Sequence, residues 1–157
     1  MWILRSPLAV GLLLLSTTNP THARSLGLSL GAVLGEPVGA SASYRFQERV
    51  AAQAHLGWRF SQQRAHLSVD GIFDLLDIPT DDAMGFHYPL YMGVGLRLLS
   101  RGTGGQKSGL GLRIPIGVAV IPDASPIEVF FELAPVIAVV PRDQVGLDAV
   151  LGGRMAF

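Results

Sequence analysis

The residues best suited to chemistry lie in the stretch around residue 68. His66, Ser68 and Asp70 occupy alternate positions there, and His55 belongs to the preceding stretch. Histidines and carboxylates are common metal ligands, and a serine near a histidine and an acid is the arrangement of a hydrolase. Side chains two apart on one strand do not easily converge on one centre. The pattern therefore favours a polar lining over a catalytic or metal site.

A larger set of charged side chains recurs at alternate positions through the chain. The cations are Arg45, Arg59, Arg97, Arg113 and Arg154, and the carboxylates are Asp70, Asp74, Glu128, Glu132 and Asp148. Equal numbers of opposite charges on one face predict ion pairs that close an interior. The alternative is a narrow polar conduit, in which the same charges would select small solutes or ions.

Several kinds of chemistry are excluded by composition. The chain has no cysteine, which rules out disulfides, thiolate zinc sites and a cysteine nucleophile. Twelve basic and twelve acidic residues balance, so nothing points to nucleic acid. The glycines between residues 93 and 109 lack the Gly-Lys-Ser/Thr ending of a phosphate loop. We predict no enzyme, no catalytic residue, no metal and no cofactor.

The first segment has the pattern of a cleaved signal peptide. Arg5 precedes an apolar run from Leu8 to Leu15, and Thr21-His22-Ala23 forms a small-residue cleavage site. A membrane-spanning helix needs about 20 apolar residues, which this run does not reach. We therefore expect residues 1–23 to be a signal peptide and residues 24–157 to form the mature domain.

Apolar and other residues alternate along nearly all of the remaining chain. Period two predicts strands, and the segments are 26–34, 38–46, 50–60, 67–75, 88–98, 110–120, 127–133 and 145–157. Pro115 lies inside the sixth segment, where it removes a ladder hydrogen bond. The alternation loses clarity after Pro135, so the facing of residues 136–140 is left open.

The two faces of these strands differ in charge. The apolar parity carries no Lys, Arg, Asp or Glu, whereas the opposite parity carries the arginines and carboxylates named above. A basic side chain facing lipid costs about 2–4 kcal/mol at the bilayer midplane, so a charge-free outer face is what a membrane strand requires. The predicted fold is an all-β, eight-stranded, antiparallel, up-and-down transmembrane β-barrel. A soluble lipocalin-like carrier is the rival fold.

Aromatic residues on the apolar parity fall near the ends of the predicted strands. Phe46, Tyr88 and Phe157 fall at one end of the barrel, and Trp58 and Phe60 at the other. Aromatic girdles at both membrane interfaces are typical of outer-membrane barrels. These five residues are our predicted membrane-interface aromatics.

Several short motifs resemble those of a bacterial family of small, uncharacterised outer-membrane β-barrel proteins. They lie at residues 34–39, 91–97, 111–117 and 131–135, and the ending 152–157 belongs with them, although it lacks the family's paired aromatics. The resemblance implies an eight-stranded barrel, similar in architecture to small OmpA/OmpX-type barrels, in the outer membrane. Phe157 resembles the terminal aromatic of outer-membrane barrel targeting signals, which implies assembly by the barrel-assembly machinery through the C-terminal strand. The family resemblance brings no known activity or cofactor.

The predicted barrel leads to an expected function without chemistry. We predict a small integral outer-membrane barrel with a charge-paired, closed lumen, in contact with outer-membrane lipid and acting as a structural or surface-interaction protein. Residues 102–109 form its expected external contact surface, for an unknown ligand. The alternatives are a narrow pore, an embedded hydrolase using His55 or His66, and a soluble carrier.

Overall fold

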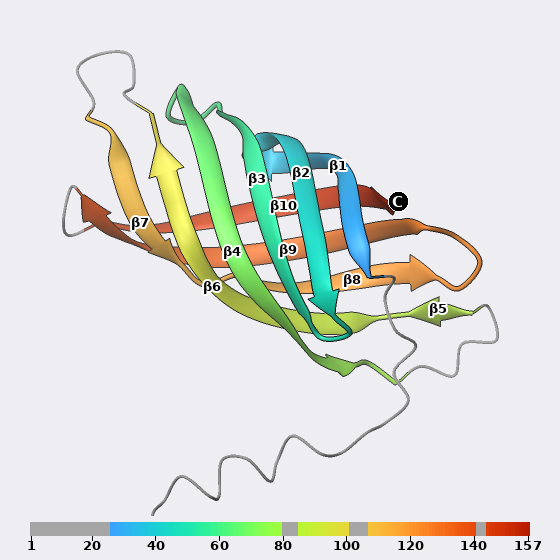
Figure 1. Ribbon diagram of the computed structural model, residues 1–157. Coiled ribbons are helices and arrows are strands. Elements are labelled where there is room, and N and C mark those ends of the chain that lie inside the picture. Colours follow the sequence, from blue (N-terminus) through green and yellow to red (C-terminus); the bar gives the residue numbers. More distant parts are fainter. Residues whose placement is uncertain (1–25, 80–84, 101–106, 141–143) are drawn as a thin grey trace, which may run out of the picture.

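The computed structural model describes residues 26–79, 85–100, 107–140 and 144–157 (Figure 1). The predicted signal peptide, residues 1–23, lies outside these ranges, as does most of the 102–109 loop. Within them no helix has the length and apolar character needed to cross a membrane.

The described chain is built from strands whose residues alternate as the sequence indicated. Their bounds are β1 Gly27–Glu36, β2 Val38–Gln47, β3 Val50–Arg59, β4 Arg64–Asp77, β5 Phe86–His87, β6 Pro89–Leu99, β7 Gly109–Arg113, β8 Ile116–Pro122, β9 Ile127–Val140 and β10 Val145–Ala156. Short connections join them, such as Pro37 between β1 and β2 and Glu48-Arg49 between β2 and β3.

The strands form a closed antiparallel ring. Neighbours along the chain are neighbours in the sheet, from β1 through β4 to β6 and on to β9 and β10. β10 then pairs with β1, with Met155 opposite Leu30. β7 and β8 share one position, since both pair with β6 on one side and β9 on the other. The ring therefore has eight positions, and the prediction of eight consecutive antiparallel strands is confirmed.

In Figure 1 the strands β1 to β4 cross in front of β9 and β10, and the interior of the ring lies between these two layers. Strong twist and tilt of this kind are what allow a sheet to meet its own edge. Closure leaves neither β1 nor β10 with an unpaired edge.

The prediction of one continuous strand over residues 110–120 was wrong. The strand is interrupted at Ile114 and Pro115, which separate β7 from β8. The amide of Ile114 donates to the carbonyl of Pro135 at 3.0 Å. In an antiparallel ladder the N–H and C=O of one residue point to the same neighbour, so the missing N–H of Pro135 also faces this interruption. The carbonyl of Pro115 accepts from the amide of Gly93 on β6 at 2.9 Å, so the missing N–H groups of the two prolines lie on opposite sides of this interruption.

Side chains alternate between the interior and the outside along most of each strand, with local exceptions at register shifts such as the one between Asp74 and Leu76. In β9 the facing left open after Pro135 is now defined: Val136 is buried, whereas Ile137 is exposed. Thirty-three large hydrophobic side chains are exposed over the described residues, against ten hydrophobic residues that are buried. The apolar parity therefore faces outward, and the apolar core is limited to two small clusters inside the ring. These are Val33, Ala119, Phe130 and Val150, and Ala51, Ile72 and Tyr91.

Candidate functional site

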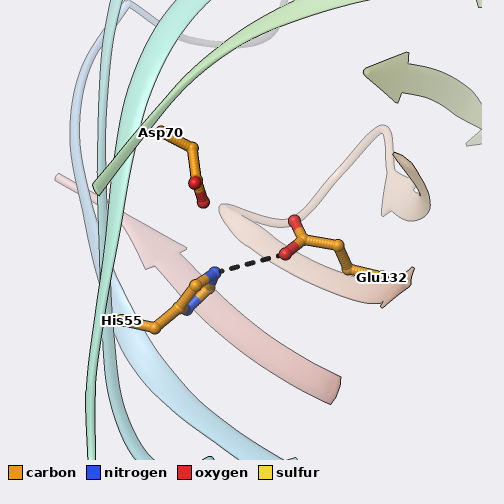
Figure 2. Close-up of side chains that lie close together, drawn as sticks. All are labelled: His55, Asp70 and Glu132. Atoms are coloured by element: carbon orange, nitrogen blue, oxygen red, sulfur yellow. Dashed lines mark ion pairs between the residues drawn. The ribbon is translucent and has the colours of Figure 1, made fainter. Parts of the chain in front are cut away.

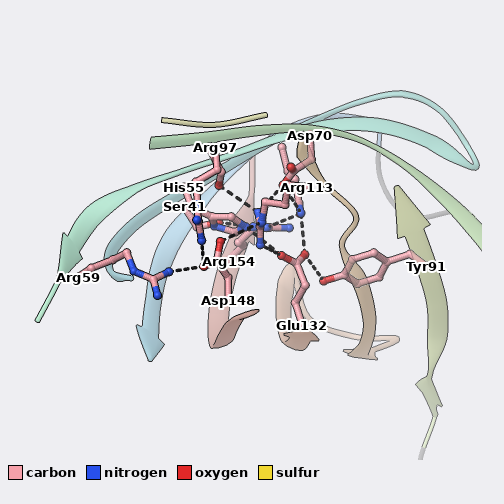
Figure 3. A network of polar contacts seen from close by, with 12 residues as sticks. Ser41, His55, Arg59, Asp70, Tyr91, Arg97, Arg113, Glu132, Asp148 and Arg154 are labelled. Carbon is pink, nitrogen blue, oxygen red and sulfur yellow. Dashed lines mark hydrogen bonds and ion pairs between the residues drawn. The ribbon is translucent and has the colours of Figure 1, made fainter. Parts of the chain in front are cut away.

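The interior of the ring is filled by a network of charged side chains centred on Arg113 (Figure 3). Arg113 projects inward from β7 and is 0 % exposed. Its Nη1 donates to Asp70 Oδ2 at 2.6 Å and to Ser68 Oγ at 3.0 Å. Its Nη2 donates to Glu132, and its Nε lies 3.5 Å from Asp148 Oδ2. One guanidinium thus contacts carboxylates from β4, β9 and β10.

Two further arginines extend the network towards the end of the ring where β3 ends and β4 begins. Arg97 Nη1 donates to Asp148 Oδ1 at 2.9 Å, and Arg59 donates to the same oxygen. Arg59 also donates through Nη2 to Glu36 Oε2 at 2.8 Å. The Asp148 carboxylate is therefore shared among Arg59, Arg97 and Arg113.

The remaining predicted charges pair at the opposite end. Arg45 Nη1 lies 3.0 Å from Asp74 Oδ2, and Arg154 Nη1 lies 3.3 Å from Glu128 Oε1. The guanidinium of Arg154 also stacks over the Phe130 ring, 4.0 Å from its centroid. All ten residues of the predicted charge network point inward, and each has at least one partner within that set.

Neutral polar side chains that sequence reasoning left out of the set complete these contacts. Tyr91 Oη donates to Glu132 Oε2 at 3.0 Å, and Gln53 Nε2 donates to the same oxygen at 2.6 Å. Arg154 donates to Ser41 Oγ at 2.7 Å and to Gln53 Oε1 at 2.8 Å. The sequence does contain a signal for these residues, because they lie on the same alternate strand positions as the charged side chains. Buried charges need such additional hydrogen bonds to offset desolvation.

Tyr91 reaches Glu132 because Gly117 leaves room for its ring. A Cβ built at Gly117 would overlap the phenol ring of Tyr91. We expect Gly117→Ala to lower the free energy of unfolding by about 1–3 kcal/mol, the usual cost of overpacking. Equilibrium unfolding in urea measures the change. The matched control is Gly71→Ala on the outer face, where the nearest atom to a new Cβ is 3.9 Å away. Equal effects of the two variants would contradict this account.

The metal or hydrolase arrangement considered from sequence is only partly assembled. The structure brings His55 and Asp70 together with Glu132, so that one ligand atom of each lies within 4.8 Å of the others (Figure 2). His55 Nε2 lies 3.7 Å from Glu132 Oε1. His66 does not belong to this group, and Ser68 faces His55 across the β3–β4 pair but bonds to Arg113.

This group is better suited to charge pairing than to chemistry. Both carboxylates already bind the Arg113 guanidinium, whose positive charge would repel a metal cation at the same place. His55 and Glu132 are 0 % exposed and Asp70 is 1 % exposed, so a dissolved substrate has no direct access to them. The geometry therefore makes these residues part of the ion-pair network.

The predicted aromatics lie at the two ends of the ring. Phe46 and Phe157 are exposed at the end that also holds half-buried Tyr88. Trp58 and Phe60 are exposed at the other end. Sequence reasoning missed Tyr44, which packs edge to face on Phe46 with ring centroids 5.0 Å apart. The sequence signal for Tyr44 is its position two residues before Phe46, on the same apolar face of the strand.

The fold and the site together define an all-β protein in which a ring of eight antiparallel strands encloses a buried ion-pair network. No family model, curated protein or solved structure matches this chain. The ring is compatible with the small-barrel architecture that the sequence motifs implied, and the family itself stays a prediction.

Proposed function

We propose that this chain is a small integral outer-membrane β-barrel, whose closed, charge-paired interior makes it a structural or surface-interaction protein. The observation that carries the proposal is the distribution of side chains, which is the reverse of that in a soluble protein: apolar residues face outward and charged residues face inward. Outward positions between the strand ends hold Leu, Ile, Val, Phe and small residues without a charged side chain, whereas the inward positions hold the arginines and carboxylates. An apolar belt of this extent is far larger than the patches of soluble monomers.

Strand length and backbone pairing support a lipid environment. Strands β1, β2 and β3 have 10 residues each, β6 has 11 and β10 has 12. A tilted strand needs about 9–11 residues to cross the hydrocarbon core. Lipid supplies no hydrogen-bond partner, so only a closed sheet satisfies its backbone there. The aromatics at both ends of the ring fit the two interfaces.

The packed interior favours a structural or interaction role over a pore. Arg113, Glu132 and Asp148 meet in the middle of the ring and are each 0 % exposed. An eight-stranded barrel has an interior that side chains just fill. The free ends and loops are then the parts that remain available for a partner.

The experiment that tests this proposal is heat modifiability. We expect the full chain, expressed in a bacterium and extracted from membranes with detergent, to migrate differently in SDS gels before and after boiling. A closed barrel stays folded in SDS at room temperature because its backbone bonds are internal. A chain that is freely soluble without detergent and shows no shift would contradict the proposal. Discrete conductance in planar bilayers would replace the closed interior with a pore.

A further inference from the structure

The end of the ring at which β3 ends and β4 begins contains a pocket with an excess of positive charge. The pocket has a volume of about 340 Å³ and lies among β4, β6, β7 and β9. Its polar lining residues are Gln62, Arg64, Arg97, Lys107 and Gln144. No described lining residue is acidic. The sequence did not predict the pocket, because its residues come from three separate connections and from the ends of four strands.

Arg64 differs from every other inward arginine that the structure describes. Arg45, Arg59, Arg97, Arg113 and Arg154 each contact a carboxylate. Arg64 instead donates to two backbone carbonyls, Nε to Ser100 at 2.7 Å and Nη2 to Lys107. Its side chain is only 8 % exposed. A guanidinium has five N–H donors, so these two bonds hold the side chain in place and leave others unused.

The neighbouring charges do not compensate Arg64. Lys107 adds an ammonium group at the rim of the pocket and forms no ion pair with a described residue. Arg97 contacts Asp148, but this carboxylate is already shared with Arg59 and Arg113. A buried cation without a counter-charge is costly, and an anion bound beside it recovers that cost.

We propose that this pocket binds the phosphate group of a phosphate monoester. The planar fork of Arg64 matches two phosphate oxygens, and Lys107, which also lines the pocket, adds a point charge. Gln62 and Gln144 provide amide donors. The volume is that of a small-molecule site and admits the phosphate with a small attached group.

Two sources offer this chemistry. One is a soluble phosphate monoester, and the other is a lipid headgroup whose acyl chains lie along the apolar outer face. Leu110 and Val140 border the pocket, and exposed Val139 and Val140 at the end of β9 continue it onto that face. The soluble source does not depend on the membrane proposal, whereas the lipid source does.

The test uses the full chain in neutral detergent micelles, with inorganic phosphate in one arm and micelles doped with phosphatidic acid in the other. Binding is followed by calorimetry and by the ³¹P chemical shift. We expect saturable binding that weakens roughly tenfold to a hundredfold in Arg64→Met, the usual range for a lost charged hydrogen bond. Lys107→Met should also weaken it. Arg49→Met, in the β2–β3 connection at the other end of the ring, is the matched control and should bind as the parent does.

The outcomes separate the possibilities. Saturation by inorganic phosphate with no tighter binding to phosphatidic acid identifies a soluble ligand, and binding that requires phosphatidic acid or is much tighter to it identifies a lipid headgroup. If Arg64→Met does not fold, exposed Lys107 supplies the decisive variant, because its side chain makes no described contact that the fold needs. Absence of saturable binding in both arms, or equal weakening by Arg49→Met, overturns the proposal. The phosphate arm can succeed when the gel shift fails, so the two proposals fail separately.

Discussion

Replacing Arg113 with methionine is expected to lower the free energy of unfolding by about 3–5 kcal/mol, the cost of breaking a buried ion pair by removing one partner. Arg113 contacts Asp70, Glu132 and Asp148, and the variant leaves these carboxylates buried with less compensation. Urea unfolding in micelles, followed by the fluorescence of Trp58, measures the change.

The control for this prediction is Arg45→Met, which breaks one pair near the end of the ring. The partner of Arg45, Asp74, is 12 % exposed, whereas Asp70 and Glu132 are 0 % exposed as side chains. The end pair is slightly more exposed and Arg45 contacts one carboxylate of the network instead of three, so we expect a smaller loss of about 1–3 kcal/mol. Adding Asp70→Asn and Glu132→Gln to Arg113→Met should recover part of the stability, because fewer charges then remain unpaired. Equal losses in Arg113→Met and Arg45→Met would show that the central network is not special.

Placing an arginine on the outer face at the centre of β6 is expected to cost about 2–4 kcal/mol in lipid. Val94 is the position to change, because it lies midway along the strand and is 57 % exposed. The cost arises from moving a charge into hydrocarbon. In water the same exposed substitution stays within about 0.5 kcal/mol.

The matched variant is Val145→Arg, at the start of β10, where the side chain is 83 % exposed. This position lies at the end of the ring, so the cost should fall to about 0–1 kcal/mol. Reversible unfolding in lipid vesicles compares the two variants. A difference between them reports depth in a bilayer. Two small, equal effects would mean that the outer face is solvated.

The ring was predictable from sequence, because the alternation within each strand indicates which residues face inward and which face outward. The alternation through Val50 to Trp58, for example, defines which side chains of β3 face inward without reference to any other strand. The charged residues of the interior follow from the same local rule.

The partners within the interior were not predictable. Which carboxylates Arg113 contacts depends on how far each strand is staggered against its neighbour, and this offset is a property of the closed ring. The lost hydrogen bond at Pro115 was evident from the sequence, but the division of the strand there was not, because the amide of Ile114 finds its acceptor, the Pro135 carbonyl, on another strand. The proposed phosphate pocket was not predictable either, because its lining depends on the stagger of the strands and on contacts between strands that are distant in sequence.

The interior arginines and carboxylates are distributed unevenly along the chain, and this affects the order in which their charges are compensated. Strands β1 to β8 place five arginines in the interior, Arg45, Arg59, Arg64, Arg97 and Arg113, against three acids that pair with members of this set, Glu36, Asp70 and Asp74. Strands β9 and β10, the last in chain order, add three acids, Glu128, Glu132 and Asp148, and one arginine, Arg154. An assembly intermediate that lacks these strands therefore carries two more interior cations than acids, five arginines against three carboxylates. The final hairpin thus both joins the edges of the sheet and neutralises the excess positive charge of the interior, so a ring without β9 and β10 is electrostatically unfavourable.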